Sequence, residues 1–298
     1  LYAKNNYALD LSALGHSYLN TSMLSTINNQ ITVAFWAYGN SAQLPTNTSL
    51  LEGYSANVNQ RNLNLHLPWS DNNMYFDAGY SSGGYDRINK VATAAEQGGQ
   101  WNHWAFTKNA TTGDMKIYLN GLLWSSGTGK TKPMSILTLI LGKDALLSNN
   151  LNYKGKINEF SIWDKDLSLV DIQTWMNRSI DATHPFYSNL VAYYKMNEGT
   201  GLNINDTKNS LVSTGVNLQW TYDRGNNLKR SFTETTLRPN IVFLNGTYAL
   251  TTTTVITKDS VARNPNVVQQ YSITSNATLT PMTHDAVVLS STSNLYAT

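Results

Sequence analysis

The chain lacks cysteine altogether and has few charged residues, and these two absences exclude several kinds of site. None of its 298 residues is Cys, which rules out disulfides, thiolate metal sites and a cysteine nucleophile. Charged side chains make up 13% of the chain and sum to a formal net charge of +2. Because Lys and Arg are scattered and the net field is weak, we expect no binding to nucleic acid.

Long hydrophobic runs are missing as well. No apolar segment approaches the roughly 20 residues that a membrane-spanning helix needs, so we expect no membrane insertion. Hydrophobic residues still amount to 41% of the chain, which is too many for a disordered protein and enough for a packed core. The sequence begins at Leu1 in a strand-like segment with no signal peptide, and we expect it to be part of a longer polypeptide.

The clearest structural pattern lies between residues 100 and 177. Apolar and polar residues alternate over 104–106 and again over 115–119, on either side of a polar turn at 111–114. This period of two predicts an antiparallel hairpin. Asn120 and Gly121 follow, a pair that adopts positive φ easily and favours a second tight turn.

A further alternating segment at 157–163 predicts another strand, and a helix follows it. Ser168 and Asp171 have the spacing of a capping box, and apolar residues recur at helical intervals behind them. We therefore expect a short helix over 168–177.

The remaining sequence reads as short strands separated by turns. Strands are expected at 7–11, 18–19, 31–38, 49–54, 62–67, 74–78, 136–142 and 190–196. The Gly-, Ser- and Asn-rich segments 68–73 and 80–90 are expected to be exposed loops. Many short strands with one helix predict an all-β protein, an antiparallel β-sandwich or jelly roll.

Composition changes towards the C-terminus. Residues 221–238 contain a turn cluster and a polar run, and a new alternating pattern with no Trp begins after Pro239. We expect a sandwich domain over 1–220, a linker over 221–238 and a small β module over 239–298. The alternative is that these last residues add strands to the first sandwich.

Five segments in order resemble one known family, the laminin-G-like branch of the concanavalin A-like jelly rolls. They read ALDL, ITVAFW, WNHWAF, YLNG and GKINEFSIW, at 8–11, 31–36, 101–106, 118–121 and 155–163. Residues 190–201 and Asp206 also look like the strand and turn that accompany such domains in secreted bacterial proteins. The resemblance covers about residues 1–220.

The resemblance implies two packed antiparallel sheets, an extracellular or cell-surface setting, and binding of a glycan or an extracellular protein. It also implies one structural calcium ion, because many relatives hold one. The positions that match the family's acidic residues are Asp10 and Glu159, although Asp10 is not followed by the Gly that many relatives carry. The alternative role for both carboxylates is to cap turns by accepting backbone hydrogen bonds.

Glycan binding needs flat aromatic faces and planar polar groups. Segments 54–61 and 69–87 supply both, and the candidate ligand-binding residues are Tyr54, Trp69, Asp71, Asn72, Tyr80, Tyr85, Asp86 and Arg87. The alternative is that these side chains pack beneath long loops. The tryptophans of the regular strands, Trp36, Trp104 and Trp163, are instead expected in the core.

Catalytic patterns are absent from the sequence. Related sandwich enzymes that cleave β-glucans place paired carboxylates on one strand, whereas the Glu residues of this chain are isolated. His103 has no Ser or Asp partner that the sequence identifies, and no zinc-ligand pair or phosphate loop is present. We therefore expect a non-catalytic binding module. The alternatives are an accessory domain of a larger glycan-active enzyme, and a glycoside hydrolase whose two carboxylates meet in a cleft.

Overall fold

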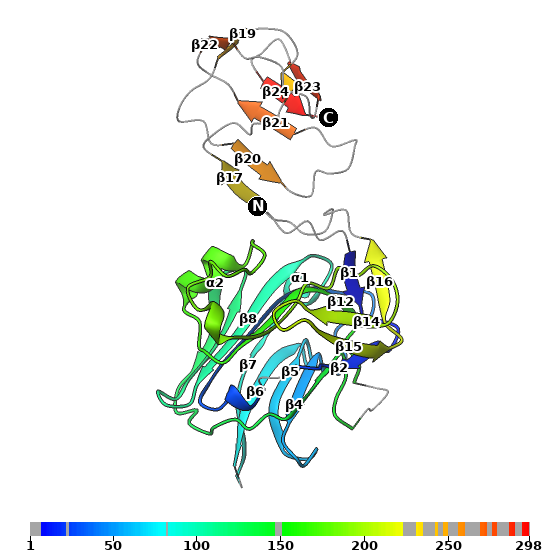
Figure 1. Ribbon diagram of the computed structural model, residues 1–298, viewed down its shortest axis with the longest axis vertical. Helices are drawn as coiled ribbons and strands as arrows, with labels where there is room; N and C mark the ends of the chain where they lie inside the picture. Colours follow the sequence, from blue (N-terminus) through cyan, green and yellow to red (C-terminus); the bar gives the residue numbers. More distant parts are fainter. Residues whose placement is uncertain are drawn as a thin grey trace. The chain divides into compact units, whose positions relative to one another are not determined.

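The computed structural model divides into two compact units, residues 1–222 and 223–298. It describes residues 7–21, 24–81, 83–146 and 151–222, and the backbone of the strands within 231–297 (Figure 1). Antiparallel strands dominate the first unit, as the sequence predicts. Among the described residues, no helix has the length and apolar character that crossing a membrane requires.

The first unit holds sixteen hydrogen-bonded strands, which form one continuous path except that the first and the last of them pair with each other beside it. The strands of its first half are β1 Tyr7–Asp10, β2 His16–Tyr18, β3 Gln30–Gly39, β4 Leu51–Tyr54, β5 Arg61–His66, β6 Asn73–Ser81, β7 Gly84–Val91 and β8 Asn102–Asn109. Those of its second half are β9 Asp114–Leu119, β10 Leu122–Gly127, β11 Thr138–Leu141, β12 Gly155–Trp163, β13 Leu190–Tyr194, β14 Asn203–Asp206, β15 Leu211–Val216 and β16 Gln219–Tyr222.

These strands form the two layers of a jelly-roll sandwich. One layer, here called the β3 sheet, has the order β10-β9-β8-β3-β12-β13-β14, and β1 joins it through β12. The other layer, the β5 sheet, has the order β2-β11-β4-β5-β6-β7. Strand β15 connects them by pairing with both β14 and β2. The antiparallel jelly-roll expectation is confirmed.

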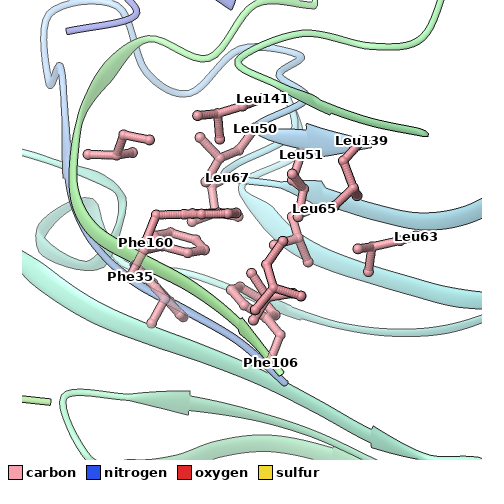
Figure 2. Packing of buried hydrophobic residues seen from close by; sticks show 14 of the residues in the cluster. Phe35, Leu50, Leu51, Leu63, Leu65, Leu67, Phe106, Leu139, Leu141 and Phe160 are labelled. Atoms are coloured by element: carbon pink, nitrogen blue, oxygen red, sulfur yellow. The ribbon is translucent and has the colours of Figure 1, made fainter. Parts of the chain in front are cut away.

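Apolar side chains from both layers fill the space between them. Phe35, Phe106 and Phe160 project from the β3 sheet towards Leu63 and Leu65 of the β5 sheet (Figure 2). All five side chains are fully buried. Because successive residues of a strand point to opposite faces, the residues between them lie on the outer faces of the sandwich.

The hairpin and turn predicted over 104–121 are confirmed. Strands β8 and β9 pair with Trp104 opposite Leu119. Asn120 and Gly121 adopt φ values of 50° and 75° and lead directly into β10. Trp104 lies in the core, as expected.

The predicted helix is also confirmed, slightly shorter than expected. Helix α2 spans Leu169–Trp175, and Ser168 and Asp171 form both hydrogen bonds of the capping box. Its Ile172 packs on the outer face of the β3 sheet in a cluster with Trp163 and Tyr193. Helix α2 and the chain after it therefore cover this outer face.

Two elements differ from the sequence-based expectations. The segment 80–90, expected to be an exposed loop, continues β6 and forms most of β7. Its period of two is hidden because the face of β7 that points into the sandwich carries the charged Asp86 as well as Ile88, while the outer face carries the aromatic Tyr85. A second short helix, α1 Ala94–Gln97, follows β7 and begins with a capping box between Thr93 and Glu96.

The second unit contains short strands in three small sheets, β17 with β20, β18-β23-β24-β21, and β19 with β22. Their bounds are β17 Ser231–Glu234, β18 Val242–Phe243, β19 Thr247–Ala249, β20 Ile256–Asp259, β21 Gln269–Ser272, β22 Asn276–Thr278, β23 Ala286–Leu289 and β24 Asn294–Ala297. Strand β17 lies within the segment that the sequence predicts to be a linker, and residues 223–230 of that segment lie outside the described residues.

Candidate ligand-binding site

The outer face of the β5 sheet is polar and aromatic, and its residues alternate with the core residues of the same strands. Glu52 faces Asn64 across β4 and β5, and Asn64 faces Asp77 across β5 and β6. These three side chains are at most 4% exposed. Buried polar groups need hydrogen-bond partners, and one such bond lies within this group, from Asn64 Nδ2 to Glu52 Oε2 at 2.9 Å.

Asp77 is the centre of this face. Its carboxylate is fully buried and accepts hydrogen bonds from Arg87 Nε at 2.5 Å and Arg87 Nη2 at 2.7 Å. Arg61 Nη1 donates to the same carboxylate at 3.3 Å. These bonds to Asp77 raise the pKa of Arg87 above its ordinary value. A forked pair of this kind fixes both the position and the plane of the guanidinium.

The two arginines in turn hold aromatic rings at the surface. The Arg87 guanidinium lies 4.5 Å from the centre of the Tyr75 ring and 5.0 Å from that of Tyr85. Arg61 lies 5.5 Å from the centre of the Tyr85 ring. Tyr80 pairs with Tyr85 across β6 and β7. The face therefore presents two neighbouring tyrosines above a fixed ionic base.

A hollow lies over this end of the polar face. It encloses about 670 Å³ of empty space, its open mouth included, and it is lined by Glu52, Val58, Asn59, Arg61, Tyr80, Gly84, Tyr85, Asp144 and Leu146. The lining combines aromatic rings with planar amide, guanidinium and carboxylate groups. This is the set that stacks on a sugar ring and hydrogen-bonds its hydroxyls.

Two carboxylates, Glu52 and Asp144, belong to the hollow. Burial raises the pKa of Glu52, and the negative charge of Asp144 adds to the increase, while Arg61 and the Ala145 N–H act against it. Both residues are at most 4% exposed. The sequence does not single out this pair, because 92 positions separate its members and no local motif joins them.

His66 lies on the same face and makes stability depend on pH. It is 3% exposed, and its Nδ1 donates to the Thr48 carbonyl at 2.5 Å. Burial lowers the pKa of His66 to about 4 from 6.5. The folded state therefore keeps His66 neutral while the unfolded chain takes up a proton, so this stability is present above pH 6.5 and is lost as the pH falls towards 4.

We expect His66 to lower the free energy of unfolding by about 2 kcal/mol between pH 7 and pH 5. Urea unfolding of the wild type and of His66→Gln at both pH values measures this difference. The variant removes the titration, so its stability should change less over that interval. Equal changes in the two proteins would contradict the prediction.

The structure separates the candidate ligand residues into groups at opposite ends of β6. Tyr80 and Tyr85 line the hollow. Tyr54 lies on the same face, opposite Arg61 at the end of β4. Trp69, Asp71 and Asn72 precede β6, at the far end of that strand, which is roughly 25 Å away.

Each of the three residues at the far end already contacts other side chains or backbone groups of the protein. The Trp69 ring lies edge-on to His66, with 4.6 Å between ring centres. Asp71 accepts hydrogen bonds from Asn73 N and Tyr75 Oη. Asn72 Oδ1 accepts from Gln97 Nε2 at 2.9 Å. These contacts bind the β5–β6 turn to the sheet and to helix α1.

Asp86 and Arg87 point to opposite faces of β7. Arg87 holds Asp77 on the polar face, as described above. Asp86 points between the two sheets, where its Oδ2 accepts a hydrogen bond from Lys108 Nζ at 2.8 Å. The same oxygen accepts from Lys132 N at 2.9 Å. Asp86 therefore lies away from the hollow.

Asp10 and Glu159 do not converge on one point. Asp10 stands opposite Lys156, and the three residues from there to Glu159 extend roughly 10 Å along a strand. Asp10 Oδ1 accepts from Ser12 N at 2.9 Å, whereas Glu159 accepts from Tyr193 Oη. The described residues contain no group of three or more His, Asp or Glu side chains placed to hold a metal ion.

These two carboxylates therefore do not fit a shared calcium ion. A structural calcium ion elsewhere in the protein stays a prediction from the resemblance. Thermal unfolding in calcium and in a chelator measures it, and a higher melting temperature in calcium would support it.

Comparison with known proteins agrees with this architecture. A structure from Bacteroides ovatus ATCC 8483, of a candidate carbohydrate-binding protein, aligns with a TM-score of 0.56 at 15% identity, covering 74% of this chain and 60% of the other. The Limulus polyphemus SAP-like pentraxin aligns at 0.43 and 15% identity, covering 58% and 83%. Domains LG4-5 of the mouse laminin alpha1 chain align at 0.42 and 14% identity, covering 60% and 44%.

At 15% identity, the Bacteroides ovatus structure shows a shared fold and no more. A search of curated proteins finds no significant match. The family model described as the concanavalin A-like lectin/glucanases superfamily matches residues 14–173, more than half of the chain and most of the sandwich. The protein therefore belongs to the concanavalin A-like lectin/glucanase superfamily, in its laminin-G branch.

Proposed function

We propose that the first unit is a carbohydrate-binding module and that the hollow on the outer face of the β5 sheet holds the glycan. The observation that carries the proposal is the pairing of Tyr80 with Tyr85 at the rim of that hollow, over the Arg61–Asp77–Arg87 network. Preformed polar groups bind a flexible sugar at a lower entropic cost than mobile ones. The carbohydrate-binding description of the Bacteroides ovatus protein supports the same class of ligand.

The chemistry of the lining favours a neutral sugar chain. Two guanidinium groups, those of Arg61 and Arg87, lie among three carboxylates, those of Asp77, Glu52 and Asp144, so acidic groups outnumber basic ones there. An acidic glycan would therefore meet more carboxylates than cations among the described residues of the lining. Hydroxyl groups can donate to these carboxylates and accept from Asn59 and Arg61.

An extracellular or cell-surface location belongs to this proposal, since such a module would attach a longer protein to external glycans. Degradation of the protein by added protease only after the cells are opened would argue against that location. Degradation by protease added to intact cells would support it.

Replacing Tyr85 with Ala is expected to weaken glycan binding about five- to thirtyfold, because loss of one stacking ring removes about 1–2 kcal/mol. A glycan array identifies a ligand, and calorimetry on that ligand gives the affinities of the variants. Trp69→Ala is the matched control, because it removes an aromatic ring at the far end of β6. If Trp69→Ala lost binding and Tyr85→Ala kept it, the glycan would bind at the Trp69 end of β6 and the proposed site would be wrong.

A second candidate function, glycoside hydrolysis, is favoured by one observation. Glu52 and Asp144 line the same hollow, and burial raises the pKa of Glu52, a property that suits a general acid. Incubation of the protein with its bound glycan, followed by assay of new reducing ends, separates the two functions. Release that disappears in Glu52→Gln would establish hydrolysis, and no release would leave binding alone.

A further inference from the structure

A second pocket lies on the opposite side of the sandwich, between the outer face of the β3 sheet and its helical cover. Strands β3, β8 and β12 supply one wall, and α2 with the chain up to residue 184 supplies the other. Its aromatic lining consists of Trp36, His103, Trp163, Trp175 and His184. The empty space is about 420 Å³ with the open mouth included, so it admits one small group rather than an oligosaccharide.

The indole N–H groups of the two buried tryptophans are already used. Trp36 Nε1 donates to the Met176 carbonyl at 2.8 Å, and Trp163 Nε1 donates to Ser161 Oγ at 3.2 Å. Ser161 Oγ in turn donates to the Ala34 carbonyl at 3.2 Å. What these tryptophans offer to the pocket is therefore apolar ring surface.

His184 brings a hydrogen-bond donor to this apolar pocket. Its Nδ1 accepts a hydrogen bond from Phe186 N at 3.0 Å. A neutral imidazole whose Nδ1 accepts carries its proton on Nε2. Burial lowers the pKa of His184 and so favours this neutral form.

The His184 side chain is buried, with only 3% exposed. Its Nε2 atom nevertheless has no hydrogen-bond partner among the described residues. Its ring is held between Trp163 and Trp175, with centres 4.4 and 4.6 Å away. A buried donor without an acceptor costs about 1–3 kcal/mol. Such a group is therefore a sign that an acceptor from outside the chain completes the site.

Glu159 provides an acceptor in the same pocket. A bulge in β12 between Asn158 and Ser161 places Glu159 in the left-handed region with φ of 53°. Few residues other than Gly adopt this conformation without a compensating role. The buried hydroxyl of Tyr193 donates to the Glu159 carboxylate, and a carboxylate accepts several hydrogen bonds at once.

The combined lining selects against a charged ligand. An anion would meet the carboxylates of Glu159 and Asp171, and a cation would meet the N–H of His184 and the guanidinium of Arg178 at the mouth. A small neutral group with one acceptor, one donor and an apolar end matches the His184 N–H, the Glu159 carboxylate and the tryptophan rings. The acetamido group has these parts, since its carbonyl accepts, its N–H donates and its methyl is apolar.

We propose that this pocket binds an acetamido group, with the carbonyl accepting from His184 Nε2–H, the N–H donating to Glu159 and the methyl against the tryptophan rings. The group could be presented by an N-acetylated sugar or by an N-acetylated amine. This site goes beyond the proposed function, because it lies on the other sheet and shares no residue with the hollow.

Titration with N-acetylglucosamine and with acetylated lysine amide, followed through tryptophan fluorescence and indole N–H resonances, tests the proposal. Glucosamine and lysine amide are the matched compounds that lack the acetyl group. We expect saturable binding of at least one acetylated compound and at least tenfold weaker binding of its unacetylated form. Binding of both acetylated compounds means that the acetamido group alone is recognised, and binding of one identifies its source.

His184→Phe keeps an aromatic ring between the two tryptophans and removes the donor, so binding is expected to weaken about tenfold. Trp175→Ala removes the partly exposed wall and serves as a second variant if His184→Phe does not fold. Tyr85→Ala, which alters only the hollow of the β5 sheet, should bind the acetylated compound like the wild type. The proposal is overturned if no acetylated compound binds, if tetramethylammonium binds more tightly, or if folded His184→Phe and Trp175→Ala both bind unchanged.

Discussion

Replacing Lys108 with Met is expected to lower the free energy of unfolding by about 4 kcal/mol. Lys108 lies on β8 and is fully buried between the two sheets. Full burial is rare for a lysine unless it is paired. Its Nζ donates to Asp86 Oδ2 at 2.8 Å and to the Ala78 carbonyl at 2.7 Å. It therefore joins β8 of the β3 sheet to β6 and β7 of the β5 sheet.

The expected loss of stability is large because Asp86, the partner of Lys108, keeps its charge in the variant. Asp86 is 8% exposed, and without Lys108 its charge stays buried with Lys132 Nζ 4.0 Å away. A buried charge that loses its main partner costs far more than the net gain from the pair. Gly79 shows how tightly this region is packed, because a Cβ there would lie 2.0 Å from the Lys132 carbonyl oxygen and 2.8 Å from Lys108 Nζ.

Urea unfolding measures the prediction, and two further variants act as controls. Lys116→Met removes a partly exposed lysine that lies 3.8 Å from Asp114, and it should change stability little. The double variant Lys108→Met with Asp86→Asn should recover most of the loss, since it leaves no charge buried. A Lys108→Met protein as stable as the wild type would show that Asp86 reaches water in its absence.

Replacing Arg87 with Met is expected to remove about 3 kcal/mol of stability together with most of the glycan binding. Two of the three arginine contacts to the fully buried Asp77 come from Arg87, and only Arg61 would remain. Arg87 Nη2 also donates to Tyr85 Oη at 3.2 Å. Losing Arg87 would therefore leave a buried carboxylate poorly paired and release the ring at the rim of the hollow.

Comparison with Tyr85→Ala distinguishes a positioning role from direct ligand contact. Tyr85→Ala should lose binding with little change in melting temperature, whereas Arg87→Met should lose both. Arg87→Lys keeps the charge but not the fork, so intermediate stability is expected. If Arg87→Met lost binding while keeping the wild-type melting temperature, Arg87 would act as a ligand contact, as the sequence analysis predicts.

Much of the fold could be predicted because its signals are local. The alternation over 104–119, the Asn120–Gly121 turn and the capping box at Ser168 each depend on residues that are close in sequence. Strand β7 is not predicted by the sequence, because its residues lack a clear local alternation. Its inward face carries the charged Asp86 beside Ile88 and its outward face carries the aromatic Tyr85, so the usual contrast between an apolar and a polar face is weak there.

Only part of the candidate site can be predicted from the sequence. Tyr80 and Tyr85 stood out as aromatic residues in a polar segment, and the structure places both at the hollow. Glu52 and Asp144 gave no signal, because they meet only after β4 and the chain beyond β11 come together. Trp69 looked equivalent to Tyr85 by composition, although the length of β6 separates them.

The sequence by itself determined the fold class, the main hairpin, the helix start and the absence of cysteine chemistry, since these follow from periodicity and residue type over short distances. Only the tertiary structure decided what each polar residue does. Of the neighbours Asp86 and Arg87, one pairs with Lys108 inside the sandwich and the other holds Asp77 on its surface. Successive residues of a strand face opposite sides, so their partners depend on strands that pair from elsewhere in the chain.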